Sequence, residues 1–298
     1  AYYNKKTTDL LLDCPVPHST GFTSIFKNIG SVCNQGVDIM VNGAPIQGDD
    51  FTWSSTLNLN YNKNEILALS DTNADVYLYD WVGGGSVLRV GESMGSFWGL
   101  ERKGVYTLED YKAGACEKTQ IGRAKRSDEK TIIGKGLPDW TGSWINNFSY
   151  KNFDLSVYIN GSVGNDIYNV LRAETNIVSA WGNQRAEVKD RWTVNNPNGK
   201  YPRAHVLVNQ NLLQSDYLIE DGSFLRIQNV TLGYTFPKVS FLRSLRIYAT
   251  TQNLLTITGY SGYNPEVNSQ GQSNLQLGVD YNAYPTARSF ILGVNIGF

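Results

Sequence analysis

The clearest pattern in the chain is an alternation of apolar and polar residues over positions 51–62. One set of alternate positions is apolar except at Ser55, and the other set holds only Thr, Ser and Asn. Successive side chains of a β-strand point to opposite faces, whereas an amphipathic helix repeats its apolar positions at intervals of three and four. The segment is therefore predicted to be a strand with one apolar and one polar face.

The same period of two recurs along the chain. The further segments that show it are 37–42, 144–150, 153–160, 229–236, 245–251 and 290–298. With shorter segments included, we count about ten strands, and no internal repeat of fixed length appears. The predicted fold class is all-β, with the strands antiparallel.

Two environments produce such strands, a soluble sandwich and an outer-membrane barrel. Three features favour the barrel: the polar face carries small uncharged residues, aromatic residues cluster at strand ends, and strand lengths approach the roughly 9–11 residues that a tilted strand needs to cross a bilayer. The apolar face is then the lipid-facing one. The residues predicted to face lipid are Leu57, Leu59, Leu155, Val157, Val230, Leu232, Phe290, Leu292, Val294 and Ile296.

Composition narrows the function classes. The 298 residues hold 26 Lys and Arg against 27 Asp and Glu, a net charge of −1 that leaves no basic surface for nucleic acid. No apolar run reaches the roughly 18 residues of a transmembrane helix. Cys14, Cys33 and Cys116 form no Cys-x-x-Cys pair, so we expect free thiols, although a pair between Cys14 and Cys33 stays open.

The connections alternate between short turns and long polar segments, as in barrels that have short periplasmic turns and long extracellular loops. Lys151-Asn152 is a tight turn, while 164–220 is predicted to be a long extracellular loop with a helix-like stretch near 176–192. Residues 1–13 have the pattern of a strand rather than of a signal peptide. We therefore expect the chain to be part of something longer.

Eight stretches carry a family resemblance, in order, over nearly the whole chain. They are YYNKKTTDLLLD (2–13), GFTSIFKNIGSVCNQGVDIMVNG (21–43), FTWSSTLNLNYNKNEIL (51–67), RVGESMGSFWG (89–99), GLPDWTGSWINNFSYKNFDLSVYINGSVGNDIYN (136–169), EDGSFLRIQNVTLGYTFP (220–237), RIYATTQNLLTITGYSGYNPEV (246–267) and ARSFILGVNIGF (287–298). In these stretches the chain resembles the SusC/RagA-type TonB-dependent outer-membrane transporters of Bacteroidota. Segments 68–86, 107–134 and 195–216 match nothing that we can place.

This resemblance implies a plugged barrel of about 22 strands. Residues 1–298 would be its C-terminal part, and the plug, the TonB box and the first strands would lie outside this chain. Such a protein imports an oligosaccharide or a peptide across the outer membrane. Its implied partners are a SusD-like surface lipoprotein that forms a lid, the TonB-ExbB-ExbD system acting through the plug, the barrel-assembly machinery and outer-membrane lipid.

The residues predict no catalytic site and no cofactor. His18 and His205 have no nucleophile at motif spacing. Asp71, Asn73 and Asp75 imitate the start of a calcium loop, but the glycine expected at its sixth position and a closing glutamate are missing. Calcium is therefore a weak candidate, in an extracellular loop or in the lipoprotein partner.

Two further roles are predicted from position. Phe298 ends an alternating strand and looks like the terminal signal that the barrel-assembly machinery reads. Trp181, Arg185 and Lys189 lie in the long loop and are candidates for docking the lipoprotein. The alternative functions are another outer-membrane barrel, such as a passive porin or a siderophore receptor, and a secreted carbohydrate-binding β-sandwich.

Overall fold

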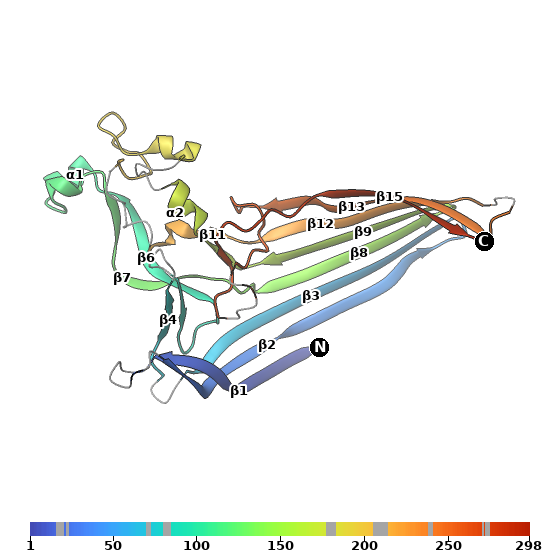
Figure 1. Ribbon diagram of the computed structural model, residues 1–298, viewed down its shortest axis with the longest axis horizontal. Coiled ribbons are helices and arrows are strands. Elements are labelled where there is room, and N and C mark those ends of the chain that lie inside the picture. Colours follow the sequence, from blue (N-terminus) through green and yellow to red (C-terminus); the bar gives the residue numbers. More distant parts are fainter. Residues whose placement is uncertain are drawn as a thin grey trace.

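The computed structural model describes residues 1–15, 21, 24–69, 73–79, 85–176, 183–204, 214–237, 241–269, 271 and 275–298. Eight long strands form one antiparallel sheet (Figure 1). In sheet order they are β1 (Tyr2–Pro15), β2 (Ser24–Gln47), β3 (Phe51–Ala68), β8 (Trp140–Tyr150), β9 (Phe153–Val163), β12 (Phe224–Thr235), β13 (Ser244–Thr258) and β15 (Ser289–Gly297). The all-β, antiparallel prediction is confirmed, and each alternating segment lies in one of these strands, except that Phe236 and Phe298 fall one residue beyond β12 and β15.

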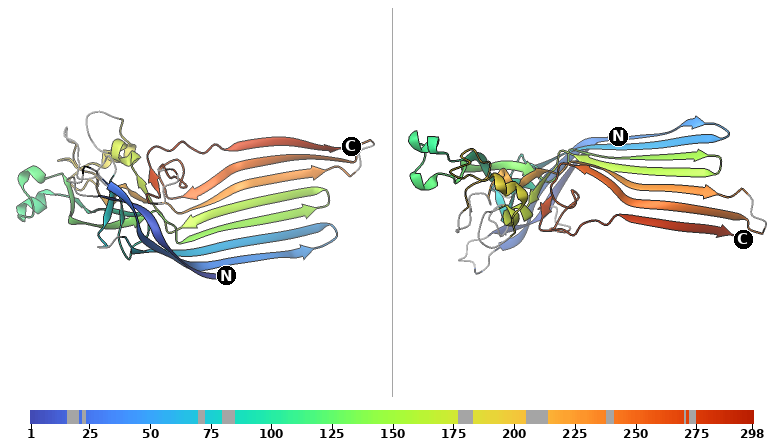
Figure 2. Two further views of the ribbon diagram at one scale, coloured as in Figure 1. Left: turned by 60° about the horizontal axis from the view of Figure 1, so that its bottom comes forward. Right: turned by 90° about the horizontal axis from the view of Figure 1, so that it is seen from above.

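The long sheet is an open strip, because β1 and β15 lie at its two edges within the described part of the chain (Figure 2). The remaining described strands, which the sequence count did not separate, form two smaller sheets. Among the described residues, no helix combines the length and apolar character needed to cross a membrane.

The short connections lie together at one end of the sheet. Tyr150 pairs with Phe153 around the predicted turn, where Lys151 takes a φ of 52°. The Lys151 amide donates to the carbonyl of Asp50 at 2.8 Å, and the carbonyl of Asn152 accepts from the Thr235 amide at 2.8 Å. Backbone hydrogen bonds therefore join this turn to the adjoining hairpins on both sides.

Three long excursions leave the opposite end, which we call the loop end (Figure 1). The first holds β4 (Val76–Tyr79), β5 (Gly85–Leu88), β6 (Ser96–Val105), α1 (Leu108–Lys112), η2 (Lys118–Gln120) and β7 (Ala124–Lys135), whose strands form a four-stranded sheet. The second holds β10 (Asp166–Asn169), α2 (Leu171–Thr175), η3 (Ala186–Asp190), η4 (Asp216–Leu218) and β11 (Ile219–Asp221). The third holds β14 (Val279–Asp280), which pairs in parallel with β10 and so joins the last two excursions.

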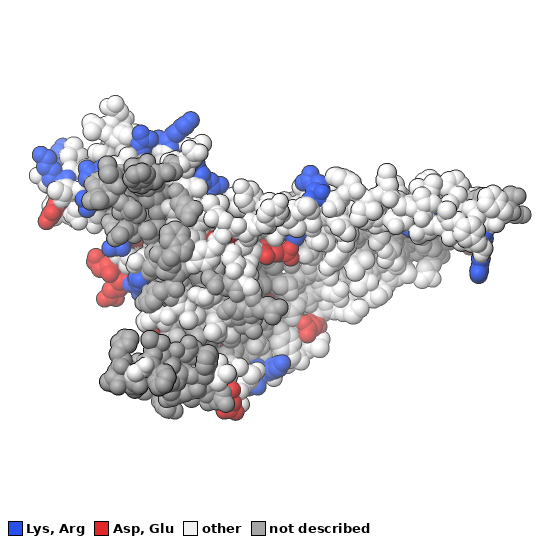
Figure 3. Space-filling view, in the orientation of Figure 1, with Lys and Arg blue, Asp and Glu red and all other residues white. Residues whose placement is uncertain are grey.

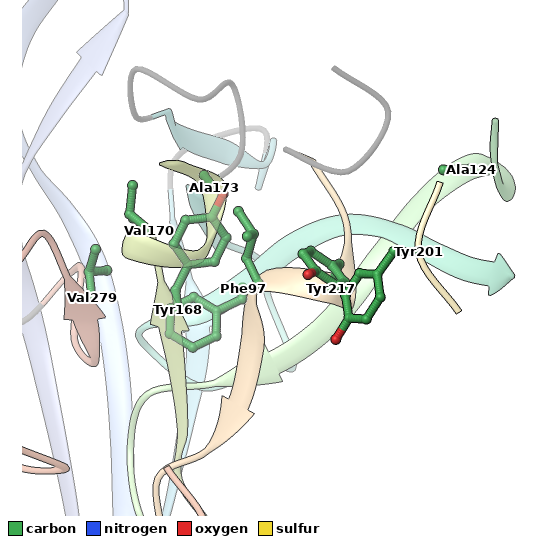
Figure 4. Packing of buried hydrophobic residues seen from close by; sticks show 9 residues of the cluster. Phe97, Ala124, Tyr168, Val170, Ala173, Tyr201, Tyr217 and Val279 are labelled. Carbon is green, nitrogen blue, oxygen red and sulfur yellow. The ribbon is translucent and has the colours of Figure 1, made fainter. Parts of the chain in front are cut away.

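The main buried core lies in these excursions and not in the long sheet. Its residues are Phe97, Ala124, Tyr168, Val170, Ala173, Tyr201, Tyr217, Leu218 and Val279 (Figure 4). The rings of Phe97 and Tyr168 lie 5.7 Å apart, and those of Tyr201 and Tyr217 meet edge to face at 6.0 Å. The loop end is therefore a folded unit with its own hydrophobic core.

The described parts of segment 164–220, which was predicted to be a long loop, belong to this unit. The helix expected near 176–192 is wrong in its described part: the α-helix lies earlier, at Leu171–Thr175, and the only helical turn within 183–192 is the 3₁₀ turn Ala186–Asp190. Arg185, at the start of that turn, makes no side-chain capping hydrogen bond. The turn-forming sequence Asn195–Gly199 follows soon after it.

The cysteine pairing left open above does not occur. Cys14 lies opposite Ile25 on the neighbouring strand, whereas Cys33 lies opposite Lys6. Cys33 and Cys116 are free thiols.

All ten residues predicted to face lipid lie on one face of the long sheet, which we call the apolar face. One row across the strands is Val41, Leu57, Trp144, Ile159, Ile227 and Leu255, and another is Ile46, Trp53, Phe148, Leu155, Leu232, Ala249 and Leu292. None of the ten is buried: Leu57, Leu59, Leu155, Val157 and Val230 are half-buried and the other five are exposed, Leu292 to 84%. A water-soluble sheet would bury such a face, so this one needs another apolar medium.

Two polar side chains on the apolar face, Asn146 and Ser55, are paired with indoles. The indole of Trp53 donates to Asn146 Oδ1 at 3.0 Å, and that of Trp144 donates to Ser55 Oγ at 2.8 Å. Asn146 is only 4% exposed. The break in the sequence alternation at Ser55 is thus compensated by a tryptophan from the next strand.

Aromatic rows bound the apolar face at both ends. Phe51, Tyr150, Phe153 and Tyr234 share a row at the turn end, and the rings of Tyr61 and Trp140 contact each other in a tilted pair toward the loop end, with centroids 5.0 Å apart. The ten-residue step from Phe51 to Tyr61 covers about 33 Å along a strand at about 3.3 Å per residue. A strand tilt of about 40° reduces this to about 25 Å, the height of the apolar band in outer-membrane barrels.

Charged residues lie mainly outside this band. Figure 3 shows Lys, Arg, Asp and Glu gathered at the loop end, with few over the long strands. On the apolar face itself, the rows beyond Tyr61 carry Lys63, Glu65 and Lys6. This change from apolar to charged side chains is what the edge of a hydrocarbon layer requires.

If the apolar face meets lipid, arginine on it will be costly. We expect Leu57→Arg or Val157→Arg to lower the free energy of folding into liposomes by about 2–4 kcal/mol near the bilayer midplane. The matched changes Asn58→Arg and Ser156→Arg, one residue away on the opposite face, should cost much less. Urea titrations of the full-length protein in liposomes measure this; equal costs on the two faces would contradict the lipid-facing prediction.

Candidate functional site

The opposite face of the long sheet, the polar face, is lined mainly by Asn, Ser and Thr that bond across the strands. Asn58 Nδ2 donates to Ser143 Oγ at 3.2 Å, and Ser156 Oγ donates to Asn147 Oδ1 at 2.8 Å. Near the turn end, the guanidinium of Arg246 binds both carboxylate oxygens of Asp154. The polar face is therefore hydrated or ligand-binding in character and carries few uncompensated charges.

A cavity of about 880 Å³ lies where the polar face meets the excursions. Its strand wall includes Asp38, Asn58, Asn60, Ser143, Tyr158, Asn160 and Ser162, and its opposite wall comes from 136–138, 265–268 and 277–278. Side-chain oxygens of Asn160 and Asn268 are buried there without a protein hydrogen-bond partner. Buried carbonyl oxygens of this kind are acceptors for water or for a ligand that donates hydrogen bonds.

Both carboxylates at the cavity already accept hydrogen bonds within the protein. Asp38 Oδ1 accepts from Asn60 Nδ2 at 2.5 Å. The carboxylate of Glu266 binds the guanidinium of Arg226, whose side chain is only 4% exposed. The cavity therefore suits a neutral, hydrogen-bonding ligand better than an ion.

Arg226 fixes the opposite wall in place. From the polar face of β12 it donates to Thr256 Oγ1 on β13 at 2.9 Å and to Asn264 Oδ1 at 2.7 Å, besides binding Glu266. Its guanidinium also lies 5.1 Å from the ring of Phe224. One buried cation thus joins the strand wall to the third excursion.

The second and third excursions are joined by further polar contacts. Within the third excursion, Tyr260 donates to Asp280 Oδ2 on β14 at 2.5 Å, and burial together with this hydrogen bond raises the pKa of Tyr260 well above its usual value. Ser261 Oγ donates to Glu220 Oε1 at 2.9 Å. The Ser261–Glu220 bond and the pairing of β14 with β10 hold the excursion that covers the cavity against the one that contains β10 and β11.

Of the three docking candidates, two can be placed. Arg185 donates to Ser261 Oγ at 2.9 Å and to its carbonyl at 3.2 Å, so it works within the excursions. Lys189 is exposed on η3, and Trp181 lies outside the described residues. Lys189 is therefore the candidate best placed to meet a partner.

The weak calcium candidate gains no support from the contacts of its described members. Both oxygens of Asp75 accept from Arg89, which holds the pKa of that carboxyl below its usual range, and Asn73 Oδ1 accepts from the Leu69 amide at 3.2 Å. Asp71 lies outside the described residues. In the described part of the chain, no group of three or more His, Cys, Asp or Glu could hold a metal ion.

Sequence reasoning missed several residues of this site. Arg226 lies in a segment predicted to be a strand, and Glu266 lies in one predicted to be a loop. The two residues pair although they are 40 positions apart in the sequence. A charged residue at an inward position of a strand was the only local signal. His18 and His205, which were predicted to have no catalytic role, lie outside the described residues.

Known proteins resemble the chain over its whole length. No protein-family model matches it. The TonB-dependent receptors P3 and P26 of Formosa agariphila are 35% and 34% identical to it over 100% of the chain, which covers 32% of each receptor. The TonB-dependent receptor SusC of Bacteroides thetaiotaomicron is 31% identical over 99% of the chain, which covers 29% of SusC.

The fold is found in solved transporters as well. The structure of the RagAB peptide transporter superimposes with a TM-score of 0.83 at 25% identity, over 100% of this chain and 33% of that one. In its closed-closed state, the RagAB peptide importer gives a TM-score of 0.80 at 26% identity. The chain thus spans about a third of the length of the proteins that it matches.

These relatives carry the names of receptors and transporters, not of enzymes, and the long sheet is part of an outer-membrane β-barrel wall. On this evidence the chain belongs to the TonB-dependent receptors of the SusC/RagA type, as a segment of about a third of their length.

Proposed function

We propose that the chain is the C-terminal part of a transporter that imports a neutral oligomeric nutrient, an oligosaccharide or a peptide, across the outer membrane. The observation that carries the proposal is the difference between the two faces of the long sheet: large apolar side chains lie exposed on one face, and a hydrogen-bonding cavity lies on the other. The names of the relatives support active import driven by TonB. The plug that would receive this energy would belong to the part of the protein outside residues 1–298.

The cavity supports a ligand rich in hydroxyl or amide groups. Asparagine and serine side chains both donate and accept hydrogen bonds, which suits sugar hydroxyls and peptide groups equally. One of the similar solved structures, RagAB, is described as a peptide transporter. For this chain both substrate classes stand as candidates.

The alternatives fit less well. A passive porin or a siderophore receptor would share the barrel wall, but the relatives that match over the whole chain are TonB-dependent receptors that include SusC. A secreted β-sandwich would bury its apolar face between two sheets, whereas that face is exposed here.

Energy dependence tests the proposed transport directly. Cells that carry the full-length protein should take up labelled oligosaccharides or labelled peptides, and should lose that uptake when TonB is deleted while the amount of protein in the membrane stays unchanged. Uptake that persists without TonB would favour a passive pore.

Filling the cavity should block import without harming the barrel. Ser143→Trp places an indole in the cavity, and we expect uptake to fall at least about tenfold. A tenfold loss of affinity corresponds to about 1.4 kcal/mol of binding free energy, which the loss of a few hydrogen bonds to the ligand is enough to cause. The control is Ser156→Trp, on the same face but outside the cavity. Equal uptake by the two variants at equal membrane abundance would remove the cavity from the pathway.

The SusD-like lipoprotein is proposed to cover the loop end, with the barrel-assembly machinery acting earlier on the terminal strand. Phe298 follows β15 and is 90% exposed, as a recognition signal should be. The excursions of the loop end offer the partner a folded platform rather than loose loops.

Crosslinking tests the docking side. A photo-crosslinker at Lys189 in the full-length transporter should capture the lipoprotein, as should one at Trp181 or Arg185 if the whole segment docks. Lys151, in a tight turn at the other end of the sheet, is the control and should capture none. Only intramolecular products at Lys189, with the lipoprotein still co-purifying, would assign this segment to self-packing.

A further inference from the structure

The apolar face contains a hollow of about 580 Å³ close to the loop end. Gly142 and Gly161 pair directly across β8 and β9 and lie in the row of Leu59 and Leu225 on the adjoining strands. With no side chain at two neighbouring positions, the sheet is locally thin. The side chains around this floor include Leu57, Trp140, Trp144, Ile159, Val163, Leu225 and Ile257.

The glycines are required by their surroundings. A Cβ on Gly161 would lie 2.5 Å from the carbonyl oxygen of Phe224, and one on Gly142 would lie 2.9 Å from Leu59 Cδ2. The leucines on each side lean toward the glycine floor, and Trp140 and Trp144 stand on the same strand as Gly142. The result is a shaped groove in an otherwise continuous row of side chains.

The strands that form the groove all lie inside the long sheet and not at its edges. The groove crosses β3, β8, β9, β12 and β13, and each of them has a neighbour on both sides in the described sheet. Strands that close the barrel at β1 and β15 therefore do not lie over it. Its outer surface meets whatever surrounds the barrel.

Its level in the membrane follows from the aromatic and charged rows. Trp140, whose ring contacts that of Tyr61, stands at the edge of the groove nearest the loop end. The rows beyond carry Lys63, Glu65 and Lys6, where headgroups would lie. The groove is thus just inside the hydrocarbon layer, beneath the headgroups at the loop end.

We propose that this groove binds one acyl chain of a membrane lipid in the leaflet at the loop end of the sheet. The inference rests on the proposed orientation, with the apolar face toward lipid. A lipid tail fits because the groove continues the lipid-facing surface, its side-chain walls are apolar, and a flexible chain can follow the thin strip over the two glycines. A headgroup would then lie beside the Tyr61–Trp140 pair and the charged rows beyond it.

The test uses the full-length transporter in liposomes that contain phosphatidylethanolamine with a photoreactive diazirine in its acyl chain. After irradiation, mass spectrometry locates the labelled residues. We expect labelling around Gly142, Gly161 and Ile257 to exceed that of the apolar face near Ile296 several-fold. Ile257→Trp, which fills the groove, should reduce the groove labelling several-fold. Ile296→Trp, the same change on the same face outside the groove, should leave the groove labelling unchanged.

Each outcome separates the two levels of the proposal. Even labelling of the apolar face, unaffected by Ile257→Trp, would overturn the bound lipid while leaving the orientation intact. Labelling confined to the polar face would overturn the orientation itself. Crosslinks from the groove to a second copy of the transporter would replace the lipid with a protein contact. Heat-modifiable mobility on gels verifies that both variants form the barrel.

Discussion

The structure depends on backbone hydrogen bonding within a medium that offers none. In hydrocarbon every strand must have its amides and carbonyls satisfied by its neighbours, so the long sheet has to be continuous. The ladder runs unbroken in order from β1 to β15 and absorbs an extra residue between Ile227 and Asn229 as a bulge. This bulge keeps Ile227 and Val230 on the same apolar face although they are three residues apart. The same requirement explains why Asn146 and Ser55, on that face, each accept a hydrogen bond from a tryptophan.

Because the strands satisfy each other's backbone hydrogen bonds, the side chains of one face can suit lipid and those of the other face can suit water or a ligand. The apolar face needs only hydrophobic side chains, and the polar face can carry the groups that a passing ligand binds. The hydrophobic effect that normally holds a domain together acts instead at the loop end, where the excursions bury their own core. Arg226 then connects this unit to the sheet beside the cavity, and the bonds of Tyr260 and Glu220 hold the excursions together. Binding and partner contacts can therefore vary in the excursions without disturbing the membrane wall.

Much of the sheet was predictable because one face of each strand meets a uniform environment. The alternation over 51–62 identified β3 and both of its faces, since Leu57 and Asn58 differ in the medium they meet. It failed to show that β3 continues to Ala68, because there Ile66 is buried against the excursions and the two faces no longer differ. The lipid-facing role of the ten residues on the apolar face and the assembly-signal role of Phe298 remain predictions. Phe298 and five of the ten residues are exposed, and the other five are half-buried.

The cavity and the loop end were less predictable for a physical reason. Their contacts join segments distant in sequence, such as Arg226 with Glu266 and β10 with β14, and no local period encodes such pairings. The run near Ala186–Asp190 was mistaken for part of a longer helix because its composition is helical, whereas its neighbours favour turns.

The central claim is that the two faces of the long sheet meet different media. Single cysteines at each position from 51 to 62, in a full-length protein whose Cys14, Cys33 and Cys116 are replaced by serine, can carry a nitroxide spin label in liposomes. Collision rates with molecular oxygen, which concentrates in lipid, and with a water-soluble nickel complex then report the medium at each site. The account predicts a period of two, with oxygen favoured at Trp53, Leu57 and Leu59 and nickel favoured at Ser54, Asn58 and Asn60. Equal accessibilities along the strand, or the opposite phase, would contradict it.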